Sequence, residues 1–86
     1  MFYVYLLENK SREHYIGCTA NLDERIKLHN SNKILSTRNK RPFEIIYYEA
    51  YKSKEDAFHR EKNLKLRANA FTGLQRRLIK SIGKAL

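Results

Sequence analysis

The sequence contains few of the residues that would link it covalently or anchor it in a membrane. Cys18 is its only cysteine, so no intrachain disulfide can form, no disulfide-linked partner is expected, and zinc sites that need two or more cysteines are excluded. No apolar run approaches the ~20 residues of a membrane-spanning helix. The first residues carry no basic side chain before Glu8, which is unlike a secretory signal peptide. We therefore expect a cytoplasmic protein without a membrane partner.

Acidic residues are also scarce. The 86 residues include 18 Lys and Arg but only 9 Asp and Glu, a formal net charge of +9. Residues 52–86 carry ten basic and three acidic side chains, a net of +7, whereas residues 1–51 carry eight and six, a net of +2. A field of this sign attracts polyanions, with nucleic acid as the first candidate and an anionic membrane surface as the second. The length predicts a single domain, residues 1–86, with a modest core.

Apolar runs and capping signals predict an α+β fold. Residues 2–7 are continuously apolar and rich in aromatic side chains, which is typical of a strand buried on both faces. A short polar connection to the next strand favours an antiparallel hairpin. The expected order is β-β-α-β-α-α, a small three-stranded, mainly antiparallel sheet flanked by helices: strands at 2–7, 14–18 and 44–51, and helices after Asn21, after Ser53 and from Thr72.

Tyrosines and a glycine share one face of the predicted sheet. Because side chains alternate along a strand, Tyr3, Tyr5 and Leu7 point to the same side, and Tyr15 and Gly17 also share a face. A glycine inside a strand is costly unless something approaches the backbone closely or the strand bends there. A bulge at Gly17, or a tight contact between Gly17 and the following helix, would explain the glycine equally well.

Charged side chains occupy the inner sides of two predicted helices. Arg25 and His29 lie one turn apart, and Glu61 falls on an apolar stripe with Ala57, Leu64 and Ala68. A buried carboxylate needs a partner or a metal. Arg25 fits a bidentate phosphate clamp or an ion pair with Glu61. Glu61 fits a ligand of Mg²⁺ or a surface glutamate, and His29 fits a phosphate contact or a structural role.

A long basic loop follows the first helix. Residues 33–43 are polar and contain the single proline, Pro42. The segment 37–41, Thr-Arg-Asn-Lys-Arg, is of the kind that contacts phosphate.

The order of these motifs resembles the GIY-YIG nuclease domain family, in its small stand-alone bacterial form, over nearly the whole chain. Tyr3-Val4-Tyr5 stands where the family has Gly-Ile-Tyr, and Tyr15-Ile16-Gly17 is the second motif unaltered. Residues 17–19, 22–25 and 28–30 are similar to the family's first helix. Its loop and third strand are matched by Thr37-Arg38, Arg41-Pro42 and residues 47–49. Its metal-binding helix is matched by residues 60–62 with Leu64-Lys65.

The resemblance implies catalytic roles for five residues. Tyr5 would act as the general base or relay a proton to it, and Tyr15 would position the water or the scissile phosphate. Arg25 would stabilise the pentavalent phosphate, with His29 assisting nearby. Glu61 would hold the single divalent metal, Mg²⁺ or Mn²⁺.

The sequence also departs from the family pattern. Leu66-Arg67 replaces a glycine-tryptophan pair, and the asparagine that larger members use near the phosphate has no firm counterpart, Asn63 and Asn69 being candidates.

The leading hypothesis is a metal-dependent endonuclease that cleaves DNA with low sequence specificity and a preference for single-stranded or distorted DNA; RNA is the alternative polymer. A nucleic-acid-binding module with weak or no catalysis is the alternative function. The expected nucleic-acid contacts are Gly17, Thr37, Arg38, Lys40, Arg41, Lys65 and Arg67.

Overall fold

The computed structural model describes residues 1–31, 33–34, 37 and 39–81. Its elements follow the predicted order β-β-α-β-α-α, and the α+β fold is confirmed. The strands are β1 Phe2–Asn9, β2 His14–Thr19 and β3 Phe43–Tyr51, and the helices are α1 Leu22–Asn30, α2 Lys54–Leu66 and α3 Ala68–Arg77. Among the helices of this described part, none is long and apolar enough to cross a membrane.

The three strands form one antiparallel sheet in the order β2-β1-β3. The central strand β1 is buried on both faces from Val4 to Leu7, as the continuous apolar run predicted. Tyr5 pairs with Gly17 on one side and with Tyr48 on the other. A β-bulge between Leu6 and Leu7 shifts the register against β3.

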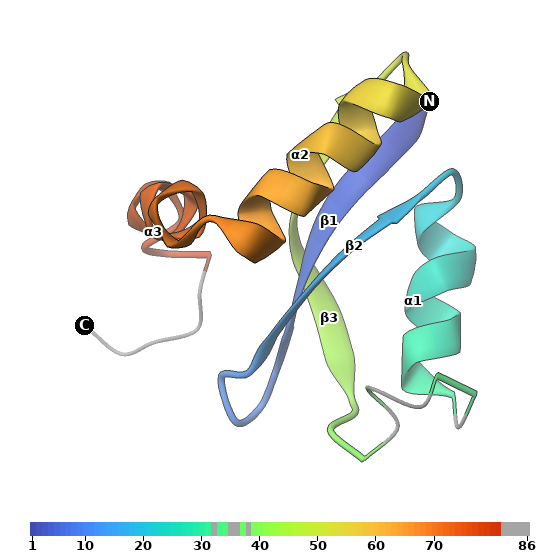
Figure 1. Cartoon of the computed structure of the whole chain (residues 1–86). Helices are drawn as coiled ribbons and strands as arrows, with labels where there is room; N and C mark the ends of the chain where they lie inside the picture. Colours follow the sequence, from blue (N-terminus) through green and yellow to red (C-terminus); the bar gives the residue numbers. More distant parts are fainter. Residues whose placement is uncertain (32, 35–36, 38, 82–86) are drawn as a thin grey trace.

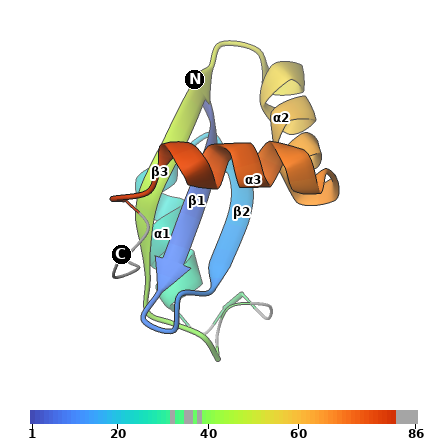
Figure 2. The same cartoon turned by 90° about the vertical axis from the view of Figure 1, so that its left-hand side faces the viewer.

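Each face of the sheet has its own apolar core. Figure 1 shows α1 on one side of the sheet and α2 and α3 on the other, and in Figure 2 α3 crosses in front of the strands. Val4 and Leu6 pack against the α2 and α3 side with Ala57, Leu64 and Leu74. The opposite core contains Tyr5, Leu7 and Phe43, with Tyr15, Leu22 and Ile26 packed against it. The alternation therefore directs Tyr5 and Tyr15 to the same face, as predicted.

Side-chain caps start the first two helices where the sequence predicts. The Asn21 side chain accepts a hydrogen bond from the backbone N–H of Glu24 at 3.1 Å, and Ser53 Oγ accepts one from Asp56 at 3.4 Å. These bonds satisfy N–H groups that have no partner within the helix.

The predicted start of the third helix was wrong. The helix begins at Ala68 rather than Thr72, and Thr72 and Gly73 lie in its interior. Arg67 is the capping residue both at the end of α2 and at the start of α3, and its side chain makes no capping hydrogen bond for α3. The local signal for this start is therefore missing. Ala68, which the predicted stripe placed on α2, belongs to α3.

Two polar contacts fix helices to β3. Asn30, at the end of α1, donates from Nδ2 to the Phe43 carbonyl at 2.8 Å and accepts from the Phe43 N–H at 2.6 Å. Arg60 on α2 donates two hydrogen bonds to the Glu49 carboxylate, at 2.9 and 3.0 Å. Tyr47 and Tyr51 also donate to Glu49, at 2.6 and 2.5 Å. Both helices that carry candidate site residues are thus held to the same strand.

Candidate active site

The side chain of Tyr5 crosses the neighbouring strand at Gly17. A Cβ atom added at Gly17 would collide with the hydroxyl end of Tyr5, and no glycine among the described residues has a positive φ. Gly17 is therefore needed for space rather than for an unusual backbone conformation. The close approach that the glycine indicated is made by the Tyr5 phenol, and not by the following helix.

His29 joins Tyr5 to Thr37 in a buried chain of hydrogen bonds. The Tyr5 hydroxyl lies 2.9 Å from His29 Nε2, and His29 Nδ1 lies 3.1 Å from Thr37 Oγ1. Both His29 and Thr37 are 1% exposed. The imidazole also contacts the Tyr15 ring, with the two centroids 4.6 Å apart. His29 is thus held by both ring nitrogens and by an aromatic neighbour.

Burial keeps both members of the Tyr5–His29 pair in their neutral forms. It raises the pKa of Tyr5 far above its ordinary value, an effect that the positive charge of Arg25 only partly offsets, while Tyr15 and Glu61 add to the rise. Burial, followed by the charge of Arg25, lowers the pKa of His29. These effects also place Tyr15, Arg25 and Glu61 within electrostatic reach of the Tyr5 hydroxyl.

Arg25 has a buried hydrogen-bond donor without an acceptor. Its Nε atom is buried and has no hydrogen-bond partner in the described part of the chain, and the positive charge of the guanidinium acts on Tyr5. A buried N–H of a charged group costs free energy when it is unsatisfied. An anion that enters beside Tyr5 would supply the acceptor.

Glu61 is the carboxylate whose charge acts on Tyr5, and its oxygens could hold a metal. Its side chain is 22% exposed, and its ion pair in the described residues is with Lys65, one helical turn away, at 3.0 Å rather than with Arg25. No group of three His, Cys, Asp or Glu side chains suited to a metal occurs among the described residues. A lone, partly exposed carboxylate is a ligand that Mg²⁺ can take together with waters and substrate phosphates.

The structure separates the predicted nucleic-acid contacts into two groups. Lys40, Arg41 and Arg67 are exposed, and Lys65 is 44% exposed. Gly17 and Thr37 are buried, so neither offers a side chain to a polymer on the surface. Arg38 lies outside the described residues.

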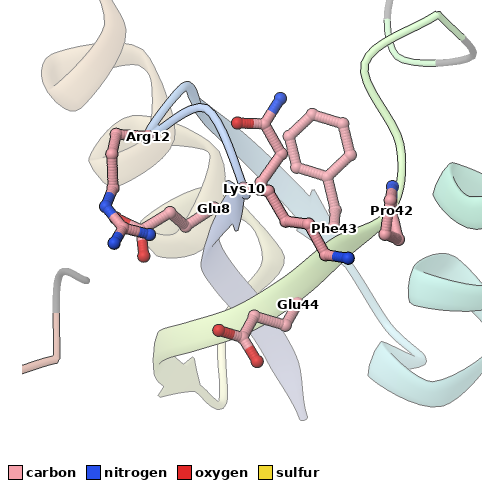
Figure 3. A pocket seen from close by; sticks show the side chains of 7 residues that line it. Glu8, Lys10, Arg12, Pro42, Phe43 and Glu44 are labelled. Atoms are coloured by element: carbon pink, nitrogen blue, oxygen red, sulfur yellow. The ribbon is translucent and has the colours of Figure 1, made fainter.

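A hollow at one end of the sheet is lined by none of these predicted nucleic-acid contacts. It has a volume of about 260 Å³ and lies between the β1–β2 turn and the start of β3. Figure 3 shows two acidic and two basic side chains in its wall, those of Glu8, Glu44, Lys10 and Arg12. This balance of charge does not favour a polyanion, and we do not assign the candidate site to this hollow.

Two features of the site were not found from the sequence. Thr37 was expected at a phosphate-contacting surface, but it hydrogen-bonds to His29 instead. The Glu49 cluster that fixes α2 was also missed. Glu49 lies on β3 and Arg60 on α2, and only the packing of this helix against the strand brings the two side chains together. The motif similarity around both was the single available signal.

Comparison with known proteins agrees with this arrangement. A family model described as the GIY-YIG catalytic domain matches residues 1–75. A UPF0213 protein of Clostridium perfringens is 39% identical over 66 residues, which is 76% of this chain and 71% of that protein. A UPF0213 protein of Staphylococcus haemolyticus is 38% identical over 64 residues, which is 73% of this chain and 78% of that protein.

A solved structure has the same fold. The solution NMR structure of a UPF0213 protein from Bacillus halodurans matches with a TM-score of 0.56 and 32% sequence identity, and the match covers 99% of this chain and 100% of that one. The family model spans the residues that converge on Tyr5, including Arg25, His29 and Glu61. The chain therefore belongs to the GIY-YIG family of nuclease domains, and its relatives are UPF0213 proteins.

Proposed function

We propose that this protein is a metal-dependent endonuclease that hydrolyses phosphodiester bonds in DNA with low sequence specificity and prefers single-stranded or distorted DNA. RNA is the alternative polymer. The observation that carries the proposal is the buried Nε of Arg25, which has no acceptor in the described part of the chain and lies on a side chain whose positive charge acts on Tyr5. A phosphate oxygen is the acceptor that a guanidinium binds best.

Arg25 binds the scissile phosphate in this scheme. Its donors face negative charge that increases as the phosphorus becomes five-coordinate, so their contribution is larger in the transition state than in the bound substrate. Because the charge of the guanidinium also acts on Tyr5, a phosphate bound to Arg25 lies within reach of the Tyr5 relay.

Tyr5 relays a proton rather than acting as a phenolate. The raised pKa of Tyr5 means that the phenol is protonated at neutral pH. The neutral His29 accepts the Tyr5 proton at Nε2, and its Nδ1–H donates to Thr37. When the attacking water gives a proton to Tyr5 Oη, the phenol passes its own proton to His29 Nε2. The water oxygen then bonds to phosphorus as the bond to the 3′-oxygen breaks.

Thr37 and Tyr15 are positioning residues in this scheme. In the tautomer that this relay requires, Thr37 Oγ1 accepts a hydrogen bond from His29 Nδ1–H, and Nε2 is free to take a proton. Tyr15 packs on the imidazole and keeps its ring plane in place, and its hydroxyl orients the water or phosphate beside Tyr5.

Glu61 would hold the divalent metal, Mg²⁺ or Mn²⁺, together with waters and a phosphate oxygen. When bound, such an ion supplies stabilisation of negative charge on the leaving oxygen. The chain's own part is to present one partly exposed carboxylate next to Tyr5, on a helix fixed by the Glu49–Arg60 contact. Lys65 pairs with this carboxylate in the structure and would turn to the DNA backbone when the metal is present.

The exposed cations provide the remaining contact with the polymer. Lys40, Arg41 and Arg67 meet the phosphate backbone, which gives affinity without reading the sequence.

A cleavage assay with a matched pair of tyrosine variants tests the function. Tyr5→Phe removes the relay hydroxyl, and we expect its rate on single-stranded DNA with Mg²⁺ to fall by about 100-fold or more. Tyr48→Phe removes the hydroxyl of the exposed residue opposite Tyr5 on β3 and should keep the wild-type rate. If all three proteins bind DNA and none cleaves it, the protein is a binding module and the proposal fails.

A further inference from the structure

Beside the proposed catalytic group, the fold has a second hollow that the chemistry above does not use. It has a volume of about 310 Å³ and lies between β2, α2 and α3, where it is lined by His14, Tyr15, Ile16, Leu64, Lys65 and Phe71. Figure 2 shows β2 at the edge of the sheet nearest to α2, with α3 crossing the sheet from the end of α2. The hollow thus lies beside β2, an outer strand of the sheet.

The composition of the wall suits a flat aromatic ligand. Tyr15, His14 and Phe71 contribute three rings, and the buried Leu64 with Ile16 forms an apolar floor. The His14 ring is fixed by its hydrogen bond to the buried Glu8 carboxylate at 3.0 Å, and it meets the Phe71 ring edge-on with the centroids 6.1 Å apart. Fixed rings lose little conformational entropy when a ligand stacks on them.

The hollow adjoins the proposed catalytic group through two of its lining residues, Lys65 and Tyr15. Lys65 lies at its rim and contacts Glu61 at 3.0 Å, and the Lys65 ammonium lies 5.9 Å from the centroid of the Tyr15 ring. Tyr15 itself contributes to both places, since its ring lines the hollow and packs on His29. A group bound in the hollow would therefore belong to a nucleotide next to the phosphate at Arg25 and Glu61.

We propose that this hollow is a nucleobase subsite, which receives one unpaired base of the strand that is cut, stacked against Phe71. Lys65 binds the phosphate of the same nucleotide. A base within a duplex is stacked and paired on both sides and cannot enter, so the subsite selects single-stranded or locally unpaired nucleic acid. The inference rests on the proposed function for the identity of the cut strand, but its test measures binding alone.

The experiment uses the full chain in buffer with a chelator, so that metal-dependent cleavage does not take place. Single-stranded oligonucleotides of about 8 nucleotides, which is within the usual site sizes, each carry the fluorescent base 2-aminopurine at one position. We expect strong quenching on binding at one position and none when the same base is paired in a duplex. Phe71→Leu keeps an apolar side chain in the core but lacks a ring, and should lose the quenching and bind about tenfold more weakly.

A double-mutant cycle, in which the Phe71 ring and the base at the quenched position are removed singly and together, shows whether the two are in contact. An abasic residue at the quenched position should weaken wild-type binding about tenfold and leave Phe71→Leu binding nearly unchanged, because the lost contact is the same one. Phe71→Tyr should restore the quenching. Phe58→Ala, which removes a half-exposed ring from α2, should behave like the wild type in every arm.

Equal losses of affinity on the abasic oligonucleotide for wild type and Phe71→Leu would overturn the subsite, as would equal quenching in duplex and single strand. Failure of the proposed function has a different result. In that case the protein does not cut any strand when Mg²⁺ is added, while the Phe71-dependent quenching is still present.

Discussion

At the scale of single residues, Gly17 decides where the Tyr5 phenol lies. Gly17→Ala places a methyl group against the hydroxyl end of Tyr5. Because β1 is buried on both faces, the ring cannot move without disturbing the core. We expect the free energy of unfolding to fall by about 1–3 kcal/mol, as measured by urea denaturation, together with loss of DNA cleavage.

Gly73→Ala is the matched control, since a Cβ there meets nothing within 4 Å. Gly73 lies inside α3, where alanine is favoured over glycine by about 0.5–1 kcal/mol. This variant should be more stable than the wild type. A Gly17→Ala protein that is as stable as Gly73→Ala would contradict the packing of Tyr5 on Gly17.

His29 should make the stability of the protein depend on pH. Its pKa is lowered in the folded protein, whereas in the unfolded chain it is about 6.5. Between these two values the unfolded chain binds a proton that the folded protein does not. The free energy of unfolding should therefore be fully retained above pH ~6.5 and should fall as the pH drops through the lowered pKa.

Urea denaturation of the wild type and of His29→Gln at a series of pH values measures this contribution. The difference between the two curves should decrease as the pH falls below 6.5. His59→Gln, at an exposed position of α2, should run parallel to the wild type. A wild-type curve parallel to that of His29→Gln would show that burial of a neutral His29 is not the cause.

Part of the site follows from the sequence at this scale. Alternation along the strands places Tyr5 and Tyr15 on one face, and helical spacing places Arg25 and His29 on one side of α1. The role of Thr37 does not follow, because a threonine in a polar loop carries no signal of burial. Its contact with His29 depends on how the loop after α1 returns to the sheet.

At the scale of elements, the Glu49 cluster holds α2 against β3. The carboxylate accepts hydrogen bonds from Arg60, Tyr47 and Tyr51. Burial and the bond to Glu49 raise the pKa of Tyr51 to about 12, so these donors stay protonated at neutral pH. Glu49→Ala leaves several donors without an acceptor, and we expect a loss of about 2 kcal/mol in the free energy of unfolding, because the pair is only partly buried.

The exposed ion pair between Lys40 and Glu13 provides the control. Both side chains are well exposed, and the ammonium lies 3.3 Å from the carboxylate. Lys40→Ala should change the free energy of unfolding by no more than about 0.5 kcal/mol. If Glu49→Ala costs as little as Lys40→Ala, then α2 is held by its apolar contacts alone.

The boundaries of most elements could be predicted because each has a local signal. Asn21 and Ser53 cap their helices, and apolar runs mark the strands. The start of α3 could not, since Arg67 provides no capping side chain and the misleading Thr72 lies in mid-helix. There the packing of Leu74 in the core determines the helix, and packing is not visible in the order of the residues. The register shift between Leu6 and Leu7 also has no local signal in the sequence.

At the scale of the whole molecule, the net charge of +9 should dominate the affinity for DNA. Binding that releases counterions weakens steeply with salt, and we expect the Kd for single-stranded DNA to rise about tenfold or more from about 50 to about 200 mM salt. Titration at several salt concentrations gives the slope. Arg67→Gln should reduce this slope by about one unit, while Lys52→Gln, at the opposite end of α2 from Arg67, should leave it unchanged. A Kd insensitive to salt would exclude backbone contacts as the source of affinity.

The proposed cleavage depends most on Glu61, because its chemistry requires a metal beside Tyr5 and Arg25. The most direct measurement is the single-turnover cleavage rate of labelled single-stranded DNA by wild type, Glu61→Gln and the control Glu55→Gln, with Mg²⁺ and with a chelator. Glu55 is an exposed glutamate on the same helix. We expect cleavage by wild type and Glu55→Gln that requires Mg²⁺, and none by Glu61→Gln. Cleavage by Glu61→Gln at the wild-type rate, or by wild type in the chelator, would contradict the proposal.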